Sequence, residues 1–133
     1  MLSKYGLSSV IDFLENYDWA SEELMDSVND GTVQTKYYIV NLPHKTPYNE
    51  AIAEYIARDE NDYIDFLNII SYIPNIMAIF YLERKIGEED IQITYAYFDI
   101  GCDELGADIT TFINELTPTL KEKILKDAKE KFI

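Results

Sequence analysis

Carboxylate side chains are the residues of this chain whose spacing most suggests chemistry. Seven of them lie between residues 12 and 30, and no lysine or arginine lies among them. On an ideal helix, most of the seven fall roughly opposite an apolar stripe. A row of this kind would meet cationic groups of a protein, and it would also imitate the phosphates that nucleic-acid-binding proteins contact. A solvated face without a role is the other interpretation. The predicted partner-binding residues are Asp12, Glu15, Asp18, Trp19, Glu22, Glu23, Asp26 and Asp30.

Trp19 belongs to this set only if the helix is continuous. A continuous helix over residues 7–30 would place Trp19 among the acids, where an exposed tryptophan is a candidate binding hot spot. Asp18 is, however, a good N-cap, and a second helix that begins at Trp19 would turn the indole into the core. We favour the break at Asp18.

A secondary acidic patch is predicted further along the chain. Tyrosines are interleaved around it, and tyrosine is favoured at interfaces, although most of these tyrosines are expected in the core with an exposed polar tip. An acidic run over residues 88–90 is expected to keep a loop solvated. The secondary patch consists of Asp59, Glu60, Asp62 and Asp65.

Catalytic and metal chemistry is not expected. Cys102 and His44 are the only cysteine and histidine, so a nucleophilic pair would need both, and a zinc site would need more. Residues 99–108 offer oxygen ligands around two glycines, but their order does not match an EF-hand. The glycine-rich motifs of nucleotide binding and the serine-hydrolase motif are absent. We therefore expect no enzyme, no cofactor and no metal.

Composition limits the classes of partner. The chain has 133 residues and a net charge of −14, with 47% apolar residues. This length and apolar content fit one domain over residues 1–133. The negative charge disfavours direct binding to nucleic acid or to an anionic membrane, and it favours a basic protein. We find no signal peptide and no apolar run long enough to span a membrane, so a cytoplasmic location is expected.

The apolar periodicity predicts an α+β fold in which several helices pack on a small, antiparallel, three-stranded sheet. The strands are predicted at about 32–42, 76–84 and 91–100, and the last two form a hairpin. Helices are predicted over 7–30, from Pro47 to the residues before Pro74 with a polar interruption, over 108–116, and from Pro118 onward.

These observations predict a small acidic partner-binding protein. Its expected role is an inhibitor that neutralises a basic or nucleic-acid-acting protein such as a nuclease. A phage or plasmid counter-defence protein, such as an anti-CRISPR or anti-restriction protein, and a toxin's immunity protein would both fit. The alternative is a non-catalytic assembly or adaptor subunit that binds through an apolar edge strand at residues 32–42. An affinity that depends on salt would favour the first.

Overall fold

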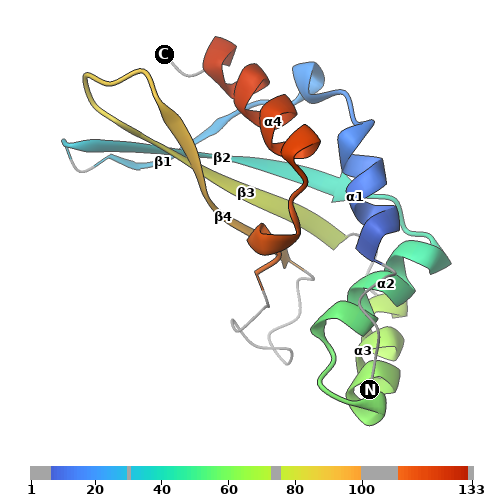
Figure 1. Ribbon diagram of the computed structural model, residues 1–133. Coiled ribbons are helices and arrows are strands. Elements are labelled where there is room, and N and C mark those ends of the chain that lie inside the picture. Colours follow the sequence, from blue (N-terminus) through green and yellow to red (C-terminus); the bar gives the residue numbers. More distant parts are fainter. Residues whose placement is uncertain (1–6, 30, 73–75, 100–110, 132–133) are drawn as a thin grey trace.

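A four-stranded antiparallel sheet with strand order β1-β2-β3-β4 forms the centre of the protein (Figure 1). The computed structural model describes residues 7–29, 31–72, 76–99 and 111–131. Each strand pairs with the next one along the chain, so the described sheet is an antiparallel meander. The strands are β1 (Met25–Asn29), β2 (Val33–Leu42), β3 (Ile76–Lys85) and β4 (Ile91–Asp99).

In the described part of the chain, four α-helices and two short 3-10 helices lie on one side and at one end of the sheet. Pro47 lies in the first turn of α2, and Pro118 opens α4, where a proline loses no helical hydrogen bond. The Thr117 hydroxyl caps α4 by accepting a 3.1 Å hydrogen bond from the Leu120 amide. The helices are α1 (Leu7–Glu15), α2 (Thr46–Ile56), α3 (Glu60–Tyr72) and α4 (Pro118–Lys131), with η1 (Trp19–Ser21) and η3 (Ile113–Glu115) between them.

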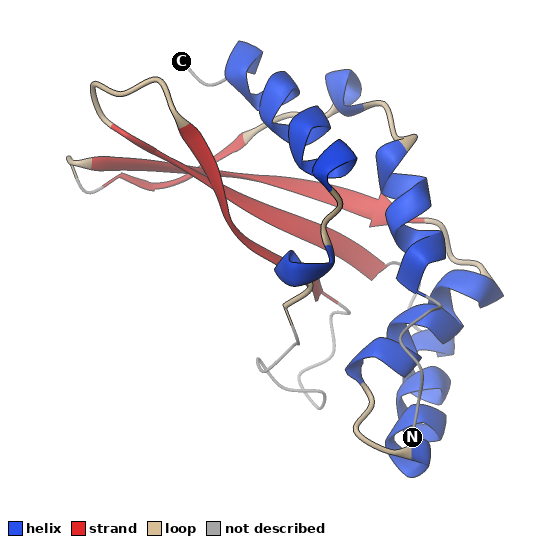
Figure 2. Cartoon of the chain, in the orientation of Figure 1, coloured by secondary structure: helices blue, strands red, loops and turns tan. Residues whose placement is uncertain are grey.

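The hydrophobic core lies on one face of the sheet. Alternate side chains are buried on this face from Tyr38 to Leu42 in β2 and from Ile76 to Leu82 in β3, because successive side chains of a strand point to opposite faces. The apolar stripes of α1 and α4 cover this face, and Figure 2 shows the helices on one side and at one end of the sheet. The opposite face is left without helical cover in the described part of the chain. Core residues include Val10, Leu14, Tyr38, Val40, Phe80, Leu82 and Ile124.

The predicted α+β class is confirmed, and all three predicted strands form with antiparallel pairing. The predicted helix over residues 7–30 is wrong beyond Glu15. The chain turns near Asp18, and Met25–Asn29 then forms β1, a fourth strand paired with β2. Gly31, with a φ of +93°, lies in the connection between β1 and β2, where the absence of a side chain permits this conformation.

Two further expectations about the strands are corrected. Residues 32–42 were expected to offer an edge strand, but β1 pairs with β2 at Gln34, Lys36 and Tyr37, so only residues 38–42 keep an open edge among the described strands. In β4, a register shift occurs where Tyr95 pairs with Tyr81 and Ile93 pairs with Leu82. This bulge leaves Ile93 packed against the core and Tyr95 exposed, although an unbroken strand would place both on one face.

Part of the predicted helix over residues 108–116 lies outside the described residues. In the part that is described, residues 111–116, the helical structure is the 3-10 helix η3. Cys102 and nearly all of the 99–108 loop also lie outside the described residues.

Candidate partner-binding surface

The carboxylates of residues 12–30 do not form one face. Asp12, Asp18 and Glu23 are exposed, but they lie on α1, before η1 and before β1 respectively. Glu15 and Glu22 are engaged internally, because their carboxylates accept hydrogen bonds from Thr117 and Tyr17. Asp26 belongs to β1, and Asp30 lies outside the described residues. The continuous acidic helix predicted from the sequence is therefore replaced by scattered carboxylates.

Trp19 is a core residue and not a surface hot spot. Its side chain is 2% exposed, and its indole N–H donates a 3.1 Å hydrogen bond to the Leu14 carbonyl. The ring meets Tyr38 and Phe80 edge to face, with centroids 5.1 and 5.3 Å away. Asp18 stops the chain from continuing as a helix, because its carboxylate accepts a hydrogen bond from the Ala20 amide. The favoured break at Asp18 is thus confirmed, with a 3-10 turn in place of the second helix.

Lysines of α4 hold the N-terminal acidic segment in place. The Lys131 ammonium donates to the carbonyls of Trp19, at 3.1 Å, and Ala20, at 3.3 Å, and also to that of Glu22. Lys123 donates to the carbonyl of Glu15. These two lysines donate hydrogen bonds to backbone carbonyls at the ends of α1 and η1, where helical partners are lacking. Their ammonium groups are therefore engaged in contacts within the protein.

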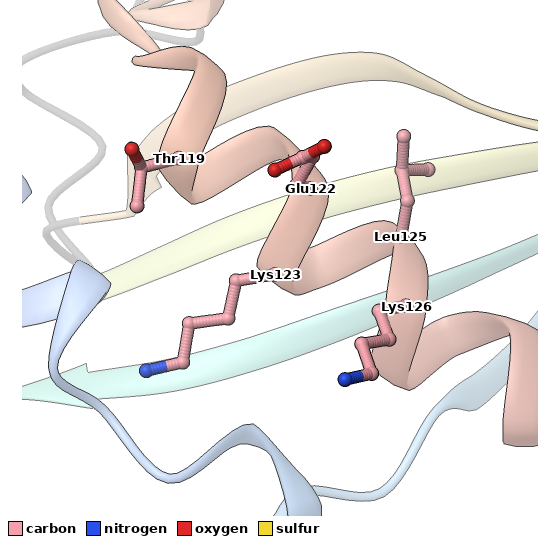
Figure 3. Close-up of a pocket in the computed structure, with 5 residues that line it drawn as sticks. All are labelled: Thr119, Glu122, Lys123, Leu125 and Lys126. Atoms are coloured by element: carbon pink, nitrogen blue, oxygen red, sulfur yellow. The ribbon is translucent and has the colours of Figure 1, made fainter.

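The outer side of α4 lines a shallow hollow of about 580 Å³ (Figure 3). Its lining is chemically mixed, with two lysines, a glutamate, a threonine and a leucine. Among the described residues, no group of three His, Cys, Asp or Glu side chains is arranged to hold a metal ion. The hollow is lined by Thr119, Glu122, Lys123, Leu125 and Lys126.

Tyr38 joins the sheet to α4 through a buried network. Its hydroxyl donates to the Asp127 carboxylate, which also lies 3.4 Å from the Lys131 ammonium. Burial raises the pKa of Tyr38 well above its ordinary value, and the nearby Asp127 carboxylate raises it further. Burial and Glu22 likewise raise the pKa of Tyr17 to about 12. Both phenols therefore stay protonated in the folded protein at pH values where an exposed tyrosine ionises.

Folding stability is expected to decline above about pH 10, where tyrosines of the unfolded chain lose their protons. The raised pKa values of Tyr17 and Tyr38 mean that the folded state keeps protons that the unfolded state releases. Their stabilising contribution is therefore complete below pH 10 and is lost as the pH rises toward the folded-state pKa. Urea unfolding at about pH 8 and pH 11 should show a smaller decline for Tyr38→Phe than for the wild type. If the stability of Tyr38→Phe and of the wild type declined equally, Tyr38 would not have the raised pKa described here.

The secondary acidic patch opens α3, and half of it has a structural role. The Asp59 carboxylate accepts a 2.8 Å hydrogen bond from the Asp62 amide. The Asp62 carboxylate accepts a 3.1 Å hydrogen bond from Arg58. Glu60 and Asp65 are exposed. Asp59 and Asp62 thus stabilise the beginning of the helix, where negative charge is favoured, and only Glu60 and Asp65 point freely into solvent among the four.

The uncovered face of the sheet carries a row of large side chains that crosses all four strands. The strand register pairs Met25 with Tyr37, Tyr37 with Tyr81, and Tyr81 with Tyr95. The ring centroids of Tyr37 and Tyr81 are 5.6 Å apart, and those of Tyr81 and Tyr95 are 6.3 Å apart. Met25 and Tyr95, at the two ends of the row, are 45% and 40% exposed. Tyr97 packs against both Tyr81 and Tyr95. We call these five side chains the tyrosine face.

Carboxylates border the tyrosine face. Glu83 follows Tyr81 by two residues in β3, and Asp99 follows Tyr97 by two residues in β4, so both lie on the same side of the sheet. The β3–β4 turn adds the exposed run of Glu88, Glu89 and Asp90. Lys85 also lies on this side of β3 and carries a positive charge. The result is an aromatic centre with a border that is mostly acidic.

Comparison with protein-family models, with curated proteins and with solved structures finds no match to the chain. Among the described helices, none is long and apolar enough to cross a membrane. A proposal about function must therefore rest on the chain's own surface.

Proposed function

We propose that the protein binds a basic protein partner and acts without catalysis, and that the tyrosine face is the contact surface. The observation that carries this proposal is the cross-strand row from Met25 to Tyr95 on a sheet face that no described helix covers. Aromatic residues and methionine are enriched at the cores of protein interfaces. Tyrosine supplies a large apolar ring together with a hydroxyl that can meet a polar partner.

The chemistry of the border supports a basic partner. Tyrosine rings attract arginine and lysine through cation–π contacts, and neighbouring carboxylates pair with the same cations. Glu83 and Asp99 supply such carboxylates on the same side of the sheet as the rings, and the β3–β4 turn carries a further exposed acidic run at residues 88–90. The net charge of −14 would also steer a basic surface toward the protein and speed their association.

A surface rich in arginine and lysine is what a nucleic-acid-acting protein presents to phosphates. We therefore propose that the partner is such a protein, for example a nuclease, and that binding covers its nucleic-acid site and inhibits it. A counter-defence protein of a phage or plasmid, or the immunity protein of a toxin, would act in this way. The carboxylates need no helical line for this role, because burial of the cationic surface is sufficient.

A non-catalytic assembly or adaptor subunit is the second candidate. One observation favours it: β1 pairs with β2 only as far as Tyr37, so residues 38–42 have no strand on that side within the described chain. A partner strand could add there through main-chain hydrogen bonds. Such a contact would depend little on charge.

Capture of the partner at two salt concentrations is expected to distinguish these candidates. If the first is correct, the captured protein will be basic, and its affinity will fall at least about tenfold between low salt and 0.5 M salt, because screening weakens charge attraction. The captured protein should also lose binding to a nucleic-acid probe when this chain is added. An acidic partner, or an affinity unchanged by salt, would contradict the proposal and favour the adaptor.

A further inference from the structure

Two strands of the tyrosine face each combine an aromatic ring with a carboxylate at the same spacing. In β3, Glu83 follows Tyr81 by two residues, and in β4, Asp99 follows Tyr97 by two residues. Residues two apart in a strand lie on one side of the sheet, about 7 Å from each other. Burial raises the pKa of Tyr97, and a hydrogen bond with Tyr81 and the nearby Asp99 charge raise it further, which places Asp99 beside that ring.

The two ring–carboxylate pairs lie at opposite ends of the tyrosine face. Asp99 pairs across the strands with Met77, which precedes Glu83 by six residues in β3, so the two carboxylate positions are about 20 Å apart along the strand. Between them the rings of Tyr81 and Tyr97 are in contact, with centroids 6.0 Å apart. A continuous aromatic surface therefore has a negative charge at each end, on the side of the sheet that no described helix covers (Figure 2).

The surroundings of these carboxylates strengthen a charge contact made there. Glu83 and Asp99 are half-buried, whereas the acidic run at residues 88–90 is fully exposed. Ion pairs that are partly buried are screened less by water and salt than exposed ones. Lys85 occupies the next position after Glu83 on this side of β3. A cation of a partner would therefore reach Glu83 from the other direction, over the ring of Tyr81.

We infer, on the basis of the proposed function, that the tyrosine face recognises arginine in preference to lysine. Each ring–carboxylate pair would take one guanidinium group, stacked on the tyrosine and paired with the carboxylate. A guanidinium is planar and weakly hydrated, so it can lie over a ring while its N–H groups point outward to an acceptor beyond the ring. An ammonium is a compact and strongly hydrated point charge, which cannot extend across both groups.

This preference narrows the class of partner. Arginine donates two parallel hydrogen bonds to a phosphate and is favoured where phosphates are recognised with defined geometry. The contact surface of the partner would thus be an arginine-bearing phosphate site, and a surface whose charge comes from lysine alone would bind more weakly.

Two flexible peptides of equal length and equal charge test the preference. One carries arginine at every third position, and the other carries lysine at the same positions, with glycine and serine between them. The full-length protein is expected to bind the arginine peptide about tenfold more tightly, as measured by titration calorimetry at about 0.15 M salt. Equal binding of the two peptides, tighter binding of the lysine peptide, or no binding of either would overturn the inference.

Variants locate the preference on the tyrosine face. Glu83→Gln removes the charge without changing the size of the side chain, and Tyr81→Leu keeps an apolar side chain without the aromatic ring. Each is expected to reduce the ratio of the two affinities by about threefold or more, whereas Tyr81→Phe should retain it. Glu60→Gln, an equal change of charge at an exposed position of α3, is the matched control and should leave the ratio unchanged. A ratio that neither Glu83→Gln nor Tyr81→Leu alters would overturn the inference.

The captured partner distinguishes this inference from the proposed function. If Tyr81→Ala weakens the partner but the two peptides bind equally, the tyrosine face is the contact surface and does not select arginine. If Tyr81→Ala leaves the partner unaffected while the arginine peptide still depends on Tyr81 and Glu83, the arginine preference stands and the proposed function fails.

Discussion

Replacement of Trp19 by alanine is expected to lower the free energy of unfolding by about 3–5 kcal/mol. Trp19 is the point where η1, β2 and β3 meet, because its ring packs edge to face against Tyr38 and Phe80. Truncation would leave a cavity that this close-packed core cannot fill, and it would remove one of the two donors to the Leu14 carbonyl, the other being the Tyr17 amide. Urea unfolding monitored by circular dichroism measures the loss.

Trp19→Phe is the control for this prediction. It keeps an aromatic ring in the core and removes the indole N–H that donates to Leu14. We expect it to retain more than half of the stability that Trp19→Ala loses. A loss below about 1 kcal/mol for Trp19→Ala would mean that the indole is not buried as described, since surface substitutions have effects of that size. The account of the broken acidic helix would then be wrong as well.

Replacement of Tyr81 by alanine is expected to weaken the basic partner by about 2 kcal/mol or more, which is roughly 30-fold in the dissociation constant. Tyr81 lies in the middle of the tyrosine face, with Tyr37, Tyr95 and Tyr97 around it. Central aromatic residues carry most of the binding energy of an interface, because the residues around them exclude water. Surface plasmon resonance with the captured partner measures the change.

Three controls make this prediction specific. Tyr81→Phe keeps the ring contacts and should retain most of the affinity. Tyr72→Ala removes an equally large but distant side chain on α3 and should leave this partner unaffected. Unfolding curves of Tyr81→Ala identify any loss that comes from destabilisation. If the folded Tyr81→Ala variant binds as tightly as the wild type, the tyrosine face is not the contact surface.

The elements that the sequence predicts well are those with strong local signals. Pro47 and Pro118 mark helix beginnings, and Tyr38, Val40 and Leu42 alternate as one buried face of a strand. The segment of residues 16–29 has no such signal. Its acids and spaced apolar residues fit a helix, but pairing with β2 overrides that local preference and turns Met25–Asn29 into a strand.

The tyrosine face was not predicted, because no local pattern contains it. Met25, Tyr37, Tyr81 and Tyr95 come from four strands, and only the register of the sheet brings them into one row. The β4 bulge adds to the difficulty, since it moves Tyr95 and Ile93 to different sides. An acidic run is easy to see in a sequence, but here Glu15 and Glu22 are used to hold the fold together.

The eleven tyrosines give the most direct test of the central proposal, because they are distributed over the sheet, α3 and the core. Tyr37, Tyr81, Tyr95 and Tyr97 mark the tyrosine face, Tyr63 and Tyr72 mark α3, and Tyr38 and Tyr55 mark the core. NMR of the protein labelled only at its tyrosine rings would show which rings change when the basic partner is added. We predict that the changes concentrate on the rings of the tyrosine face. Unchanged rings there, together with changes at Tyr17 or on α3, would contradict the proposal.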